Sequence, residues 1–242
     1  MSLFSDITHP SRIKILKCLE NNPMNLTEIS KLLEISKPEV SRHLSKLREL
    51  GLISQEEKTN HLTDLGLTIL TILSPFDVIL ENFNYFTGHS LSYLPEFLVK
   101  NIDALSESKL IIGAGLVLKK IFEITSKMSN EIKLMTSQPS PDIPQEKRGQ
   151  IKIIAPSYAK KENLNPERIS NLFYKFEIKA LDEINIALVI VDNKFGLISF
   201  PSLDGLTDAN YSFYVENVIG IDFLNKVWDY YWESAKFKDK SS

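Results

Sequence analysis

Two basic side chains, four residues apart, have the chemistry to bind a polyanion. Arg42 and Lys46 lie within the segment 36–51 (SKPEVSRHLSKLRELG), and a spacing of four brings both onto one side of a helix. A guanidinium can pair with a guanine base edge through two hydrogen bonds, and a lysine can hold a phosphate. These residue types therefore favour binding of double-stranded DNA.

The same segment must form a helix for the two cations to act together. Val40, Leu44 and Leu47 repeat at steps of four and three residues, which predicts an apolar stripe on the other side. Ser36, with Glu39 three residues later, predicts a capping-box start. A short capped helix with an apolar back fits a DNA major groove, although an ordinary amphipathic surface helix would show the same pattern.

Further helices and a hairpin are predicted around this segment. A first helix spans residues 6–19, and a second begins at Asn25, whose spacing to Glu28 is that of a capping box. A tight connection at 34–35 then leads into the helix at 36–50, as in a helix-turn-helix motif. Gly51 predicts the end of that helix, because glycine accepts a left-handed backbone.

A short hairpin is predicted to follow, with strands at 52–55 and 60–63 forming a wing. Within it, basic and polar side chains could reach the DNA backbone, whereas Glu56 and Glu57 would repel it. His43 lies between the apolar and polar sides of the preceding helix, where a structural role is at least as well supported as a DNA contact. The candidate DNA-binding residues are Lys37, Pro38, Ser41, Arg42, Ser45, Lys46, Lys58 and Asn60.

In order, these pieces resemble the ArsR-like regulators of archaea and bacteria. The similar segments are residues 9–16, 40–47, 49–53 and 62–66. The resemblance covers about the first 75 residues and implies binding of duplex DNA by a homodimer, with one recognition helix in each major-groove half-site. Metal-sensing members carry a paired-cysteine motif where this chain has NLTEI at 25–29, so we expect no metal site.

An apolar linker and a second domain are predicted after the wing. Residues 65–86 have a helical apolar period despite Pro75, and 92–105 read as another amphipathic helix. We expect helix 65–86 to bury apolar surface in a homodimer, with a terminal helix at 218–236 as a second candidate surface. The predicted organisation is a winged helix-turn-helix domain at 1–75, linker and dimerisation helices at 76–106, and an α/β regulatory domain at 107–242.

The second domain is predicted to contain a mixed sheet. Its last two strands are joined by a tight turn at 192–194. Segments 195–205 and 228–233 resemble the C-terminal domain of methanogenesis regulatory protein-type ArsR-like regulators. The layout is also similar to half of a phospholipase D-like domain, but the H-x-K-x4-D signature is absent, so hydrolysis is not implied. The predicted elements are strands at 110–113, 131–136, 151–155, 174–180, 184–191 and 195–200, helices at 117–128, 166–173 and 218–236, and a loop at 139–144.

Composition excludes several classes of function. A 242-residue chain with 43% hydrophobic and 24% charged residues is typical of a soluble globular protein, and a net charge of −3 argues against a protein coated in basic residues. Cys18 is the only cysteine, which excludes an intramolecular disulfide. Without a secretory signal or a sufficiently long apolar span, we expect a cytoplasmic protein with no membrane partner.

The sequence therefore predicts a transcriptional regulator that binds DNA as a homodimer. Residues 1–75 carry nine basic and nine acidic side chains, which predicts modest non-specific affinity. The second domain is expected to sense a small-molecule effector or a partner, with no cofactor. Motifs of serine hydrolases, P-loop enzymes and zinc proteases are missing, so we expect no enzyme, although a degenerate phosphodiesterase stays a minor alternative. The main alternative is a winged-helix adaptor that binds protein instead of DNA.

Overall fold

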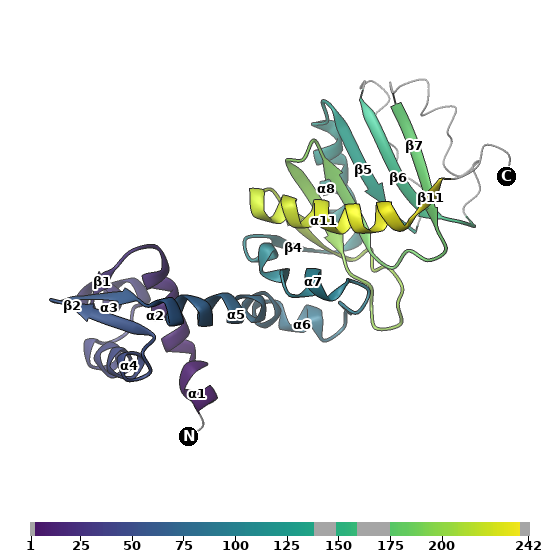
Figure 1. The fold of residues 1–242 in the computed structure, drawn as a ribbon. Helices are drawn as coiled ribbons and strands as arrows, with labels where there is room; N and C mark the ends of the chain where they lie inside the picture. Colours follow the sequence, from purple (N-terminus) through teal and green to yellow (C-terminus); the bar gives the residue numbers. More distant parts are fainter. Residues whose placement is uncertain (1–2, 138–148, 159–174, 238–242) are drawn as a thin grey trace. The chain divides into compact units, whose positions relative to one another are not determined.

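The computed structural model of the chain describes residues 3–137, 149–158 and 175–237 (Figure 1). It divides into two units, Met1–Ser74 and Pro75–Ser242, and each is described by itself. The loop predicted at 139–144 and the helix predicted at 166–173 lie outside the described residues. The proposed three-part organisation of the chain stays a prediction.

The first unit is a winged helix-turn-helix, as predicted. Its core is formed by apolar side chains from α2, α3, α4, the wing and the start of α5. The elements are α1 (Leu3–Ile7), α2 (Pro10–Asn21), β1 (Met24–Asn25), α3 (Leu26–Leu33), α4 (Lys37–Glu49), β2 (Ile53–Glu56), β3 (Thr59–Leu62) and the first turns of α5 (Asp64–Glu81).

Two details of this unit differ from the prediction. The helix expected at 6–19 is divided into α1 and α2, because His9 caps α2 and Pro10 occupies its first position, where a missing N–H costs nothing. The wing also gains a third strand, since Met24 of β1 pairs with Asn60 of β3. A two-residue strand paired across 36 positions gives no local pattern to read.

The exit from the wing is closely packed. Thr63 Oγ1 donates to the Gly51 carbonyl at 2.7 Å and accepts from the Gly66 N–H at 3.1 Å, so it both holds the wing and caps α5. A Cβ atom on Gly66 would lie 2.1 Å from the Leu52 carbonyl oxygen. Only glycine permits this approach of α5 to the base of the wing.

The linker region, residues 65–105, contains more and shorter helical segments than predicted. The helix expected at 65–86 ends at Glu81, and a separate turn, α6 (Phe83–Phe86), follows Asn82. The single helix expected at 92–105 was wrong, because the segment forms α7 (Glu96–Val99) and a 3-10 turn, Ile102–Leu105. Pro95 sets the start of α7 and helps to explain why no helix runs through from residue 92.

The second unit is built on one mixed sheet, as the sequence predicted, but in the described residues the sheet has eight strands where six were expected. Strands β5, β6 and β7 are parallel, and the other neighbours are antiparallel. The order is β11-β7-β6-β5-β8-β9-β10-β4. The strands are β4 (Lys109–Ile112), β5 (Glu131–Met135), β6 (Gln150–Pro156), β7 (Lys175–Leu181), β8 (Ala187–Val191), β9 (Phe195–Ser199), β10 (Tyr211–Val215) and β11 (Lys236–Phe237).

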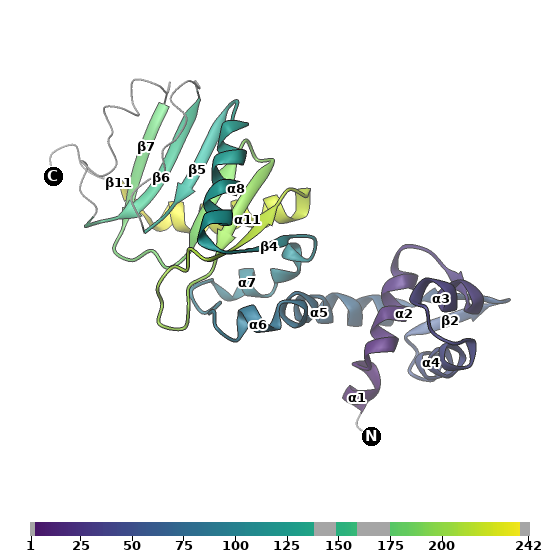
Figure 2. The same ribbon diagram turned by 180° about the vertical axis from the view of Figure 1, so that it is seen from behind.

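Helices cover both faces of this sheet. α11 (Val218–Ser234) crosses one face in Figure 1, and α8 (Ala114–Ser126) lies on the other, which Figure 2 brings to the front. Alternate side chains of each strand enter different cores: Leu188 and Ile190 pack with α11, whereas Val189 and Val191 pack on the α8 side. The second unit is therefore a three-layer α/β/α arrangement. No helix in the described parts of the chain could span a membrane.

Candidate nucleic-acid interface

The helix-turn-helix is fixed by its own local hydrogen bonds. Asn25 Oδ1 accepts from the N–H groups of Thr27 and Glu28 at 2.9 and 3.1 Å, and the Glu28 carboxylate accepts from the Asn25 N–H at 2.8 Å. This confirms the predicted capping box of α3. The turn into α4 uses Glu34 in the left-handed region, with φ of 56°, and Ser30 Oγ donates to the Ile35 carbonyl at 2.7 Å.

α4 buries its predicted apolar stripe completely. Val40 and Leu47 are 0% exposed and Leu44 is 2% exposed. Ser36 Oγ accepts from the Glu39 N–H at 3.4 Å, which is the forward half of the predicted capping box. Gly51 has a φ of 70° just beyond the helix, as expected for the residue that ends it.

The outer face of α4 displays cations and small polar groups. Lys37 and Arg42 are exposed, and within the described residues neither side chain has a hydrogen-bond or ion-pair partner. Pro38, Ser41 and Ser45 are exposed on the same helix. A guanidinium without a protein partner keeps all its donors for a ligand. The structure thus brings six of the eight candidate residues together on one helix, Lys46 included.

Lys46 is held more tightly than its place in the sequence indicates. Its Nζ lies 2.9 Å from Glu49 Oε1 and 3.6 Å from Asp6 Oδ2, and its side chain is 28% exposed. The hydrogen bond to Glu49, with the charge of Asp6, raises the pKa of Lys46. Its charge is therefore shared with two carboxylates, whereas that of Arg42 is not. A phosphate contact by Lys46 stays a prediction.

The two candidates in the wing are placed differently. Lys58 is exposed at the hairpin turn, beside Glu57, whose φ is 53°. Asn60 is 1% exposed, and its Nδ2 donates to the Met24 carbonyl at 3.0 Å. This corrects the expectation that Asn60 could reach DNA, because its side chain ties β3 to β1 inside the unit.

His43 is a core residue of α4. It is 2% exposed, its ring lies 4.7 Å from that of His9, and neither of its nitrogens has a hydrogen-bond partner among the described residues. Glu39 Oε1 is 3.7 Å from Nε2, too far for a hydrogen bond. Burial, followed by the nearby charges of His9, Arg42 and Arg12, lowers the pKa of His43. His43 thus packs beneath the polar face, within the core of the unit.

The structure adds Arg48 and Gln55, which the sequence reasoning did not select. The Arg48 guanidinium donates to Gln55 Oε1 of β2 and to Ser45 Oγ, at 3.3 Å for the latter. Arg48 therefore connects α4 to the wing. Its basic side chain was visible in the sequence, but its partner becomes apparent only once the hairpin is placed beside α4. A shallow depression next to this connection is lined by Asn25, Leu26, Thr27, Gln55 and Lys58.

Comparisons with known proteins bear on this unit. Residues 9–55 match the family model described as bacterial regulatory protein, arsR family. The HTH-type transcriptional regulator MJ0229 of Methanocaldococcus jannaschii is 40% identical over 50 residues, which cover 21% of this chain and 53% of that protein. Transcriptional repressor SdpR of Bacillus subtilis is 37% identical over 57 residues, covering 24% and 63%. The chain thus spans between about half and two thirds of these relatives.

Two solved structures resemble larger parts of the chain. TrmBL2, an archaeal chromatin protein, covers 95% of this chain and 94% of its own at 13% identity, with a TM-score of 0.41. NucT from Helicobacter pylori covers 55% of this chain and 99% of its own at 11% identity, with a TM-score of 0.40. At such TM-scores these likenesses carry no argument about function.

Proposed function

We propose that this chain, whose first unit carries an ArsR-type helix-turn-helix domain, is a sequence-specific DNA-binding transcriptional regulator. The observation that carries the proposal is the exposed Arg42, which has no hydrogen-bond or ion-pair partner among the described residues, on a helix whose opposite face is fully buried. Such a helix can enter a major groove without exposing its core. The printed names of the two relatives, both regulators, support the same function.

The proposed contacts divide by chemistry. Arg42 reads a base edge, because a guanidinium pairs with guanine through two hydrogen bonds. Lys37 and Ser41 hold phosphates beside it, and Lys58 at the wing reaches the neighbouring backbone. Arg48 is a positioning residue, since its hydrogen bonds connect the recognition helix to the wing strand. Phosphate contacts make affinity depend on salt, whereas base contacts make it depend on sequence.

Substitution of Arg42 tests this proposal. Arg42→Ala should weaken binding to duplex DNA from upstream of the protein's own gene by about 1–3 kcal/mol, or roughly 5- to 150-fold. Fluorescence anisotropy at several salt concentrations gives the measurement. Lys119→Ala is the matched control, because Lys119 is an exposed cation on α8 of the other unit. Equal losses from the two substitutions, or none from Arg42→Ala, would reject a specific role for α4.

We also propose that the regulator acts as a homodimer through α5. Leu65, Ile72, Phe76 and Leu80 are 52%, 61%, 58% and 64% exposed. Their spacings of seven, four and four residues place them on one stripe of a helix. Large apolar side chains aligned in this way favour burial against a second copy, which would supply a second recognition helix for a palindromic site. The exposed Val218 and Ile219 of α11 are a further candidate surface.

The dimer has its own test. Ile72→Glu combined with Phe76→Glu should convert a dimer into monomers in analytical ultracentrifugation, because charges resist burial without partners. Thr71→Glu is the control, since Thr71 is exposed on α5 beside the stripe. A wild-type protein that sediments as a monomer at all accessible concentrations would contradict this part of the proposal.

The second candidate function is a winged-helix adaptor that binds protein. The balanced charge of residues 1–75, nine basic against nine acidic, favours it. Binding to duplex DNA that weakens as salt rises distinguishes the regulator from the adaptor. In the regulator, the second unit modulates DNA binding by sensing a ligand or partner, and we propose no catalytic role for it.

A further inference from the structure

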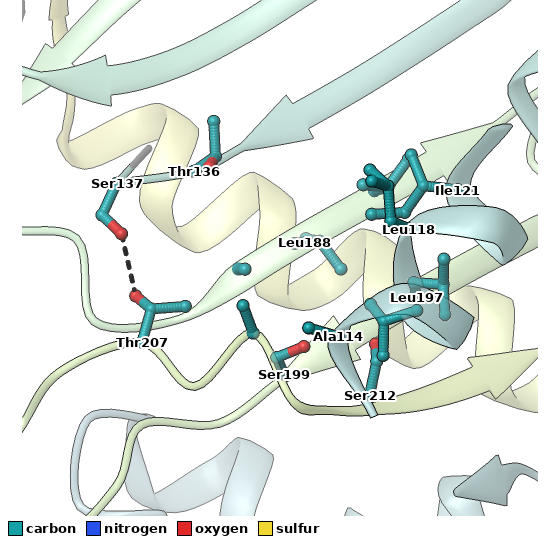
Figure 3. Close-up of a pocket in the computed structure, with 14 residues that line it drawn as sticks. Ala114, Leu118, Ile121, Thr136, Ser137, Leu188, Leu197, Ser199, Thr207 and Ser212 are labelled. Carbon is teal, nitrogen blue, oxygen red and sulfur yellow. Dashed lines mark hydrogen bonds between the residues drawn. The ribbon is translucent and has the colours of Figure 1, made fainter. Parts of the chain in front are cut away.

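A pocket of about 290 Å³ lies in the second unit, between α8 and the sheet (Figure 3). One wall is aliphatic and comes from α8, through Val117, Leu118 and Ile121. The opposite wall is formed by β8, β9 and β10, and the ends of the neighbouring segments add hydroxyl groups. In Figure 3 the hydrogen-bonded pair Ser137 and Thr207 lies at one side and the aliphatic group at the other.

The strand register explains why a pocket exists here. Val189, Leu197 and Tyr214 face α8 from paired positions of three adjacent strands and fill one row with bulk. Two residues further along each strand, the next row faces α8 with small side chains, which are too short to reach the helix. These are Ala187, Ser199 and Ser212.

A packed core would place large aliphatic residues in the second row, as it does in the first. Two of its three positions carry hydroxyl groups instead. The Ser199 side chain is 5% exposed, lines the pocket, and has no hydrogen-bond partner among the described residues. Ser199 Oγ is not among the described side-chain atoms that are both fully buried and unpaired, so the hydroxyl faces the open pocket and is free to bond to an oxygen atom of a ligand.

The other hydroxyls have their protons engaged. Ser137 Oγ donates to Thr207 Oγ1 at 3.2 Å, and Ser212 Oγ donates to the Ile198 carbonyl at 3.2 Å. Both keep lone pairs that can accept from a ligand, while Ser199 keeps a proton to donate. None of the described residues that line the pocket is charged. An ionised ligand would lose its hydration there without gaining a counter-ion.

We propose that this pocket binds a small, uncharged, largely aliphatic molecule with one carbonyl or hydroxyl oxygen. Ser199 donates a hydrogen bond to that oxygen, and the carbon chain lies against Leu118 and Ile121. At about 30 Å³ for each water-sized group, the volume admits on the order of ten non-hydrogen atoms. This inference rests on the proposed function only where the ligand is taken to be an effector of the regulator, because binding of the ligand itself requires no DNA.

Titration of the full chain with 2-octanone tests the proposal without DNA. Carbon-13 methyl spectra should shift at Val117, Leu118, Ile121 and Leu197 and leave the methyl groups of the first unit unchanged. Octanoate, with the same chain length and a negative charge, should bind at least tenfold more weakly, because its carboxylate is desolvated in the pocket. Octanoate that binds as tightly as the ketone would overturn the uncharged class.

Two substitutions separate this site from adventitious binding. Ser199→Ala should weaken 2-octanone binding about 5- to 10-fold without lowering the thermal midpoint, because among the described residues its hydroxyl has no partner to lose. Ala114→Leu should block the pocket. Gly115→Leu is its matched control on the same helix, where an added Cβ meets no atom within 4 Å.

Each outcome decides the proposal. Methyl shifts that Ala114→Leu abolishes and Gly115→Leu preserves support the site. No shift in the wild-type chain, or equal shifts in all variants, overturns it, and neither result depends on whether α4 binds DNA. A failure of DNA binding with intact ketone binding would reject the proposed regulator function while leaving the pocket in place.

Discussion

Helices α4 and α8 have the same length, 13 residues each, and the same relation to a core, yet they present different surfaces. Each buries an apolar stripe, with Leu47 and Ile124 both 0% exposed. Outward, α4 displays Lys37 and Arg42, whereas α8 displays Leu116, which is 58% exposed. The inner face decides where a helix packs, and the outer face is left to determine what it can bind.

The basic side chains of the two helices also differ in their ion-pair partners. Lys120 of α8 and Lys127, the residue just after its end, both bind Glu123, at 2.6 and 2.9 Å, and these hydrogen bonds lower the pKa of Glu123 to about 2. On α4, Arg42 has no carboxylate partner among the described residues. Lys119 is exposed on α8 as well, so the contrast lies in the kind of cation: Arg42 presents a planar guanidinium that can pair with a base edge through two hydrogen bonds, which a lysine cannot do.

The largest expected effect is on the free energy of unfolding, when one buried side chain on the inner face of each helix is shortened. It tests whether the two inner faces contribute equally to stability. Leu47→Ala in α4 and Ile124→Ala in α8 should each lower the free energy of unfolding by about 2–5 kcal/mol, because each leaves a cavity in a packed core. Both tryptophans lie in α11, so their fluorescence during urea unfolding follows the second unit, and amide hydrogen exchange in α4 follows the first.

Leu116→Ala is the control for the outer face of α8. Its effect should stay within about 0.5 kcal/mol, because an exposed side chain leaves no cavity. A cost as large as that of Ile124→Ala would mean that the outer face of α8 is covered in solution, and the contrast with α4 would then fail.

The next largest difference between the two helices is expected in how their stability depends on acidic pH. The pKa of His43 is lowered in the folded unit, so the unfolded chain binds more protons once the pH falls below about 6.5. Stability of the first unit should therefore be complete above that pH and decrease as the pH falls toward the folded pKa. Hydrogen exchange of α4 amides between about pH 7 and 5 measures this loss.

His43→Leu should flatten that pH dependence, since it keeps a bulky side chain and removes the titrating ring. Over the same range α8 should show no loss from Glu123. Its folded pKa is lowered to about 2, so its contribution is present above its unfolded pKa and disappears only as the pH falls through about 2. An unchanged pH profile in His43→Leu would exclude His43 as the cause.

The smallest expected effect concerns the charge that α4 shares. Glu49→Gln removes the partner of Lys46 and should raise DNA affinity about two- to fivefold, the scale of one exposed ion pair. Glu20→Gln in α2 makes the same change in net charge at an exposed site outside this pair. Equal gains in the two variants would show that net charge, and not release of Lys46, is responsible.

Features that are fixed by residues close together in the sequence were predicted correctly. The Asn25 capping box, the left-handed Gly51 and the tight turn at 192–194 depend on neighbours within a few residues, and the structure confirms all three. Asp192 and Asn193 both have a φ of 52°, as a type I′ hairpin requires. Helix α11 was likewise visible from its apolar period, ending two residues earlier than predicted.

Features that depend on contacts between residues far apart in the sequence were not predicted. The same holds for a strand whose burial on both faces removes the alternation of polar and apolar residues. Strand β10 was not predicted, because four of its five side chains are buried and both of its faces are covered, so the alternation of polar and apolar residues is lost. Asn60 looked like an exposed residue of the wing until β1 was found beside it. Lys46 looked free because Asp6, its second partner, lies forty residues away.

The sequence by itself determined the helix-turn-helix, its caps and the cation on its outer face, since helical period and capping act over a single turn. Tertiary structure decided which of those polar groups stay available, because ion pairs and burial join residues that are far apart in the chain. It also decided the pocket. Ala187, Ser199 and Ser212 are unremarkable small residues until strand register sets them in one row, opposite α8.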